Sequence, residues 1–237
     1  MKQPSLHKQQ PLFLLRTVMW AIALLSFLVT LARMLGSFIN EPSSSPASVQ
    51  ELASSGGVPN VVSTIILNLR LYDTISEVIV FTLASMGVGL LLEKDLKMPT
   101  IKGFEDNSSI TLFRIAAVLN SLLAVELALR GHLSPGGGFA AGVAGGTALA
   151  LVLLCGGDRD AIAKYNHIKA GTLEEIAVLL FVVLSCLILE GINLPTGIYG
   201  DTLSGGMIPI LNILIGIKVT LGSWGMVQRF LSTNELL

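Results

Sequence analysis

The feature that most constrains this chain is a series of apolar runs, each long enough to cross a lipid bilayer. A membrane-spanning helix needs about 20 largely apolar residues. Six such runs occur, at approximately 18–35, 75–92, 112–129, 138–155, 173–192 and 207–230. Because backbone groups in hydrocarbon must be paired internally, runs of this length form helices. The sequence therefore predicts an all-α, polytopic membrane protein with about six transmembrane helices.

The composition excludes several classes of protein. Hydrophobic residues make up 52% of the chain and charged residues 13%, against about 25% charged in an ordinary soluble domain. These proportions exclude a disordered chain, a nucleic-acid binder and a soluble cytosolic enzyme. The two cysteines lie inside apolar runs, and the three histidines show no metal-ligand spacing. We therefore expect no metal site, no cofactor and no catalytic site.

The basic residues indicate an orientation. Lysines and arginines gather in the N-terminal segment, between the second and third runs, and between the fourth and fifth. Cytoplasmic loops are enriched in such residues, so the pattern predicts that both termini are cytoplasmic. Arg130 is the one basic residue on the opposite side.

The chain divides into three predicted units. Residues 1–59 contain the first span and a linker, at 36–59, that is rich in Ser, Pro and Gly and predicted to be external. Residues 60–109 contain the second span, and residues 110–237 contain four further spans. Residues 61–70 have helical apolar spacing, and joined to the second span they would form a helix of 32 residues, about 48 Å long. That length exceeds a bilayer core, so we expect a break near Asp73, preceded by a surface or re-entrant helix.

Ionisable residues inside spans are expensive in lipid and are therefore candidates for function. Lys218 lies near the middle of the sixth span. A buried lysine that gains and loses a proton could serve a proton relay, whereas a buried structural ion pair is the alternative. Glu126 and Arg130 are four residues apart and are predicted to pair on one helix face. Such a pair is either a helix-end salt bridge or one stop on a hydrated path.

Asp73 and Glu77 are the acids at the start of the second span. The segment from Thr74 to Glu77 is predicted to be a capping box, with Thr74 at the N-cap and Glu77 reaching back. That interpretation accounts for Glu77 but leaves Asp73 as a candidate for the ion path. Glu174 and Glu175 open the fifth span, where acids in a first turn complement the helix dipole.

A glycine-rich segment separates the third and fourth spans. Pro135, followed by Gly136, Gly137 and Gly138, predicts an unwound turn. Gly138, Gly142 and Gly146 recur every four residues, which gives one small-residue face for close helix packing. His132 lies beside this turn, either as a structural hydrogen-bond donor or as a titratable member of a path.

Two motifs carry a family resemblance. One is His-Leu-Ser-Pro-Gly-Gly-Gly-Phe at 132–139, and the other is the segment 204–219, from Ser-Gly-Gly-Met-Ile-Pro to Gly-Ile-Lys-Val. Through them, residues 112–230 resemble the B subunit of the multisubunit Mrp (Mnh) sodium/proton antiporters. Residues 60–92 resemble the C-terminal tail of the Mrp A subunit, through Asn60-Val61 and the segment 70–77. The chain departs from the family at Leu71, Tyr72 and Ala140, and no departure removes an ionisable group.

The resemblance implies a small integral subunit of a Na⁺/H⁺ antiporter in a prokaryotic plasma membrane, or alternatively in a thylakoid. Its implied partners are the large A and D subunits, the small C, E, F and G subunits, the lipid bilayer, Na⁺ and H⁺. It favours Asp73, Glu77, His132 and Lys218 as members of an ion or proton path, and Glu126 less strongly. Two alternatives stay open. One is a membrane-arm subunit of a redox-driven ion pump, such as a membrane-bound hydrogenase or an NADH-type complex, and the other is a passive scaffold.

Overall fold

The computed structural model describes residues 56–92, 106–155 and 167–233, together with isolated positions at 21, 24, 25, 28, 29, 31, 32, 36, 51, 54, 104 and 165. Within the three ranges every regular element is helical. The elements are α3 (Val61–Thr64), the π-helix η2 (Ile65–Leu69), α4 (Leu71–Leu92), α5 (Asn107–Arg130), α6 (Gly138–Leu154), α8 (Ala170–Leu189) and α9 (Ile208–Thr233). Most of the predicted first span and most of the predicted linker lie outside the described residues.

Four of these helices, α4, α5, α8 and α9, are long and apolar enough to cross a bilayer by length and composition. The apolar helix α6 is shorter, with 17 residues, or about 26 Å. These five helices correspond to the second to sixth predicted spans. The prediction of an all-α, polytopic membrane protein is therefore confirmed, and the orientation of its termini stays a prediction.

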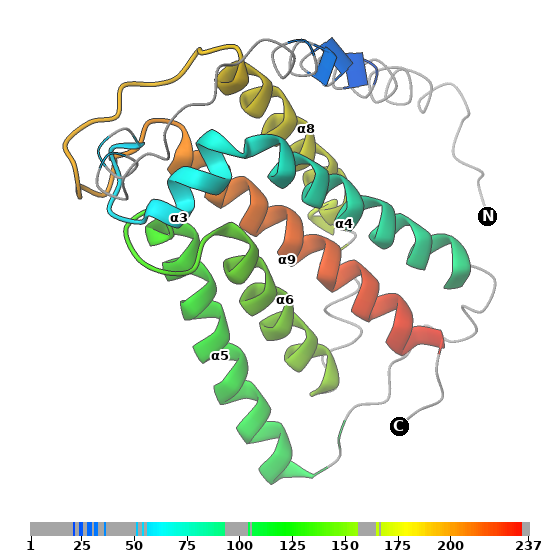
Figure 1. The fold of residues 1–237 in the computed structure, drawn as a ribbon. Coiled ribbons are helices and arrows are strands. Elements are labelled where there is room, and N and C mark those ends of the chain that lie inside the picture. Colours follow the sequence, from blue (N-terminus) through cyan, green and yellow to red (C-terminus); the bar gives the residue numbers. More distant parts are fainter. Residues whose placement is uncertain are drawn as a thin grey trace.

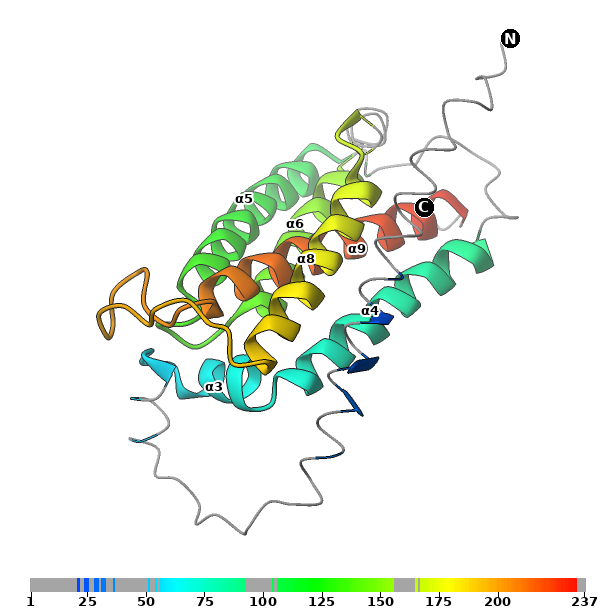
Figure 2. The ribbon, with the colours of Figure 1, turned by 90° about the horizontal axis from the view of Figure 1, so that it is seen from above.

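Helix α9 lies at the centre of the bundle (Figure 1) and contacts α4, α5, α6 and α8. Seen from above, α4 lies on one side of α9, and α5 and α6 lie on the other (Figure 2). The main core is built from apolar rows of α4 and α8 that pack against α9. Its fully buried members include Leu71, Ile75 and Val78 of α4, Val178 and Phe181 of α8, and Leu211, Ile215 and Val219 of α9.

The junction between η2 and α4 confirms one prediction and corrects another. The chain breaks at Arg70, with φ −117° and ψ 35°, three residues before Asp73, near which a break was expected. Helix α4 begins at Leu71, so Thr74 lies inside it, and the predicted capping box is wrong. The Thr74 hydroxyl instead donates to the Ile66 carbonyl at 2.6 Å. A π-turn leaves carbonyls without their usual α-helical partners, and this side chain satisfies one of them.

The helix that begins at 61 is confirmed, and Asn60 fixes its position. The Asn60 side chain accepts from the Ser63 N–H at the start of α3. Its amide nitrogen donates to the carbonyls of Gly131 at 2.7 Å and Ser134 at 2.9 Å. One side chain thus caps α3 and ties it to the turn between α5 and α6.

That turn is unwound, as predicted from Pro135 and its glycines. Gly136 and Gly137 have φ values of 144° and 97°, which favour glycine because L side chains are strained there. The glycines of α6 lie against α9. A Cβ atom on Gly138 would lie 2.5 Å from the Asn212 carbonyl oxygen, and one on Gly146 would lie 2.6 Å from the Ser223 Cβ. Gly142 packs equally closely on Val219, and Gly145 on Thr220. Helices α6 and α9 therefore approach each other nearly backbone to backbone.

Candidate functional site

Lys218 lies inside the bundle, about 15 Å from the first residue of a helix about 39 Å long. Its side chain is 1% exposed, and its ammonium nitrogen donates to Oε1 of Glu174 on α8, whose side chain is 14% exposed. Ionised groups are rarely buried unless they are paired. The structure therefore joins the predicted mid-span lysine to an acid from the neighbouring helix.

Two further residues, Phe81 and Gly222, lie beside the Lys218–Glu174 pair. The Phe81 ring, from α4, lies with its centroid 5.0 Å from the Lys218 ammonium nitrogen. Gly222, one turn after Lys218, leaves open the space between the three helices. A Cβ there would lie 2.7 Å from Cε1 of Phe81, 2.9 Å from Oε1 of Glu174 and 3.4 Å from Nζ of Lys218. Helices α4, α8 and α9 thus meet at one buried charge pair.

The prediction that Glu174 complements a helix dipole is wrong. Helix α8 begins at Ala170, so Glu174 is its fifth residue and its first turn contains no acid. Lys169 precedes the helix in a left-handed conformation, with φ 51°. Because α8 begins at Ala170 and not at residue 173, where the apolar run begins, Glu174 lies about one turn further inside the helix than the sequence indicated.

Aromatic and polar groups lie between this pair and the C-terminal part of α9. Tyr165 packs edge-on against Trp224, with ring centroids 4.9 Å apart. Burial, and then the nearby Glu174 carboxylate, raise the pKa of Tyr165. The buried Trp224 Nε1 and Gln228 Oε1 have no hydrogen-bond partner among the described residues. Water molecules are the usual partners of such buried groups.

A second polar group lies around the N-terminal end of α9. Asn212, 1% exposed, accepts from the Gly138 N–H at 2.9 Å and so caps α6, whose own N-cap residue, Gly137, has no side chain. Its Nδ2, and the hydroxyls of Thr64, Ser185 and Ser204, are buried without a partner in the part of the chain that is described. This end of the bundle therefore also offers positions for bound water.

His132 lies completely buried in the turn between α5 and α6. Among the described residues, neither ring nitrogen has a hydrogen-bond partner of ordinary geometry. Burial lowers the pKa of His132, and the nearby backbone groups of Asp201 and Thr202 oppose that effect. The folded turn therefore favours the neutral imidazole.

This burial predicts a pH dependence of stability. The lowered pKa means that the unfolded chain binds a proton more readily than the folded chain, so stability is lost as pH falls below about 6.5, the ordinary histidine value. The unfolding temperature of the purified protein should fall more steeply from pH 7 to pH 5 than that of His132→Gln. Equal slopes for the two proteins would contradict this account of His132.

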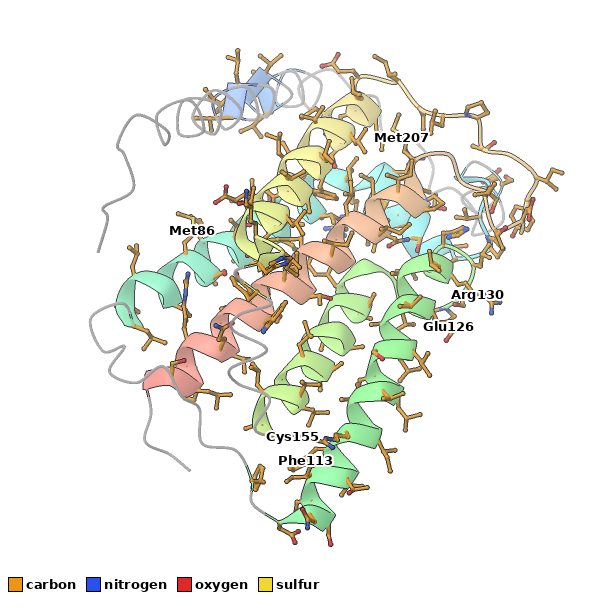
Figure 3. All side chains as sticks on the ribbon, turned by 180° about the vertical axis from the view of Figure 1, so that it is seen from behind. Met86, Phe113, Glu126, Arg130, Cys155 and Met207 are labelled. Atoms are coloured by element: carbon orange, nitrogen blue, oxygen red, sulfur yellow. The ribbon has the colours of Figure 1, made fainter. Side chains whose placement is uncertain are left out.

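The other predicted path residues lie apart from the Lys218 pair. Asp73 pairs with Arg70 at 2.5 Å, at the start of α4, and Glu77 lies on the exposed face of that helix. Glu126 and Arg130 form the predicted pair, at 3.7 Å, near the end of α5 (Figure 3). In the described part of the chain, none of the three acids forms a hydrogen bond or ion pair with Lys218.

The sequence interpretation missed Glu174, Phe81 and Gly222 as parts of the site. A signal for Glu174 was present, because a mid-span lysine needs an acid, and Glu174 is one of two acids at the start of the neighbouring span. Phe81 and Gly222 carry no such signal, because phenylalanine and glycine are ordinary residues of transmembrane helices.

Comparison with known proteins shows which family this chain resembles. Residues 109–225 match the family model described as a domain related to the MnhB subunit of Na⁺/H⁺ antiporters. A protein of Rhizobium meliloti, described as the probable A/B subunit of a K⁺/H⁺ antiporter, is 32% identical over 129 residues, which are 44% of this chain and 13% of that protein. An uncharacterized protein of Methanocaldococcus jannaschii is 28% identical over 195 residues, covering 70% of this chain and 74% of that protein.

A solved structure is similar over most of the fold. It is a chain of the membrane-bound sulfane sulfur reductase, an archaeal respiratory membrane complex, with a TM-score of 0.66 and 28% identity. The match covers 89% of this chain and 97% of that one. The family match includes α6, α8, most of α5 and α9 up to 225, and therefore both Glu174 and Lys218. The chain is thus an integral membrane protein of the Mrp/MnhB-type family, with its MnhB-related domain at residues 109–225.

Proposed function

We propose that this chain is a membrane subunit of a multisubunit cation/proton antiporter, and that its Lys218–Glu174 pair is a protonation site on the transport path. The observation that carries the proposal is the pair itself, a lysine and a glutamate buried together in a membrane bundle. Intramembrane ionisable residues mark ion pathways and proton relays. The buried polar groups toward both ends of α9 support a hydrated connection to the pair.

The exposed charges support membership of an assembly. Glu77 lies on the outer face of α4, about 9 Å from the start of that helix, and Glu126 is half exposed on α5. A carboxylate facing lipid at membrane depth is unfavourable, so neighbouring subunits are the fitting surroundings for these faces. On the family pattern those neighbours are the large A and D subunits and the small C, E, F and G subunits.

The transported cation is proposed as Na⁺, from the family description. The Rhizobium meliloti relative carries K⁺ in its name, so K⁺ is the competing cation. In this scheme Asp73, Glu77, Glu126 and His132 are further members of the path, at or near its ends. The membrane is proposed to be a prokaryotic plasma membrane, and the chain has no catalysis of its own.

A second function is favoured by one observation, the likeness to a chain of a respiratory membrane complex over 89% of this chain. In that case electron transfer in partner subunits drives ion movement past the same Lys218–Glu174 pair. The pair and its surroundings are then unchanged, and only the energy source differs.

One experiment separates the two functions. The assembly is purified in mild detergent through a tag on this chain, its subunits are identified by mass spectrometry, and it is reconstituted into proteoliposomes. Antiport predicts large antiporter-like subunits and a collapse of an imposed pH gradient on adding Na⁺ or K⁺. Iron–sulfur or nickel–iron subunits, with ion movement only on adding an electron donor, would favour the redox-driven pump. A chain that purifies alone would contradict both.

A further inference from the structure

The Lys218 ammonium faces a ring as well as an acid. Its nitrogen lies 5.0 Å from the centroid of Phe81, inside the range of about 6 Å over which a cation is attracted to an aromatic face. Lys218 is 1% exposed, so water screens this attraction little. The ring is therefore placed to stabilise the charged form of the lysine.

The position of Phe81 is fixed by the packing of α4. Leu71, Ile75 and Val78 form the buried row of this helix and pack in the core with α8 and α9. Phe81 follows Val78 by three residues, so it continues the same face one turn further. It is partly buried against that core. Any shift of α4 along α9 would move the ring relative to Lys218.

Gly222 makes the approach of the ring possible. A Cβ on this residue would lie 2.7 Å from Cε1 of Phe81 and 2.9 Å from Oε1 of Glu174. Those separations are shorter than side-chain carbons adopt, so any larger residue would displace the ring or the carboxylate. The Phe81 ring of α4 thus fits beside Lys218 because Gly222 of α9 has no side chain.

Phe81 also lies outside the MnhB-related domain at 109–225, whereas Lys218, Glu174 and Gly222 lie inside it. We propose that Phe81 is a positioning residue, which holds the Lys218 ammonium beside Glu174 through its ring face and so makes the charge state of the pair depend on the docking of α4. This proposal rests on the proposed function of the pair. It assigns to the segment 60–92 a direct part in the site rather than a purely structural one.

Fluorinated phenylalanines test this role, because fluorine withdraws electron density from the ring face with little change of size. Mono-, di- and trifluorophenylalanine are introduced at position 81 of the purified, reconstituted assembly. We expect cation/proton exchange at neutral pH to fall by about threefold for each fluorine, and its pH profile to shift stepwise toward lower pH. The same series at Phe113 is the control. That ring packs at a tilt against Phe104, with centroids 5.1 Å apart, so fluorine there should change neither the exchange rate nor the pH profile.

A second measurement does not depend on transport. Unfolding temperatures of the fluorinated series are compared in the natural background and in the double variant Lys218→Met, Glu174→Met. Stabilisation of a cation by the ring predicts a stepwise loss with fluorine only where Lys218 is present. If fluorine lowers the unfolding temperature equally in both backgrounds, the proposal is overturned and Phe81 is a space-filling residue.

The transport measurement has its own outcomes. An unchanged pH profile across the series, in an assembly that needs the pair for exchange, would overturn the role of Phe81 while leaving the proposed function intact. Normal exchange by the double variant would instead remove the proposed function and this role together.

Discussion

Replacing Lys218 with methionine should lower the free energy of unfolding by about 3–5 kcal/mol, the usual effect of breaking a buried ion pair. The reason is that the Glu174 carboxylate, 14% exposed, then remains in the bundle without its cation. The converse variant, Glu174→Met, leaves the lysine unpaired and should be equally unstable. Thermal unfolding of the detergent-purified assembly, with the yield of assembled complex, measures both effects.

The double variant Lys218→Met, Glu174→Met should recover most of the lost stability. Apolar residues of similar volume often replace a buried ion pair without loss. Ile217→Met is the matched control, because this neighbour of Lys218 on α9 is 42% exposed and faces away from the pair. If both single variants unfold at the temperature of the natural protein, the pair is not the buried contact described here.

Gly142→Ala should prevent close packing of α6 on α9. The added methyl group would overlap the Cβ of Val219 and lie 2.7 Å from its Cγ1. Valine has little rotamer freedom in a helix, so the two backbones must separate. The expected loss of stability is about 3 kcal/mol, the upper part of the usual range for overpacking, and thermal unfolding measures it.

Gly87→Ala is the matched control for that change. Gly87 is also a glycine inside a helix, but a Cβ on it would meet nothing within 4 Å. Alanine is a better helix former than glycine by about 1 kcal/mol, so this variant should be unchanged or slightly more stable. Equal unfolding temperatures for Gly142→Ala and Gly87→Ala would contradict the packing described for α6.

The helices themselves follow from the sequence because hydrophobic length is a strong local signal. The five spans that fall in the described residues were predicted, and the glycine face of α6 was predicted from the spacing of Gly138, Gly142 and Gly146. The Glu126–Arg130 pair was also predicted, because it depends on residues within about one turn of a single helix. Lys218 was recognised because a lysine inside an apolar run is unfavourable unless something balances it.

The missed features depend on how neighbouring helices are aligned. Apolar runs define helix ends only to within a few residues, and a shift of one turn decides whether Glu174 lies at a helix start or beside Lys218. The error at Thr74 has a local cause, because the π-turn at Ile65–Leu69 moves the start of α4 back to Leu71. The contact of Phe81 with Lys218 requires knowledge of which faces of α4 and α9 meet, and one sequence alone does not contain it.

The most direct test of Lys218–Glu174 as a protonation site is ion exchange by the assembly that carries Lys218→Met and Glu174→Met together. The double variant is chosen because its stability should be preserved, which separates transport from folding. Proteoliposomes with equal subunit content are given a pH gradient, and its collapse on adding Na⁺ or K⁺ is followed. We predict a loss of at least about a hundredfold, the lower range for removing a proton-transferring group. Exchange at the rate of the natural assembly would contradict a role of the pair in transport and leave it a structural contact.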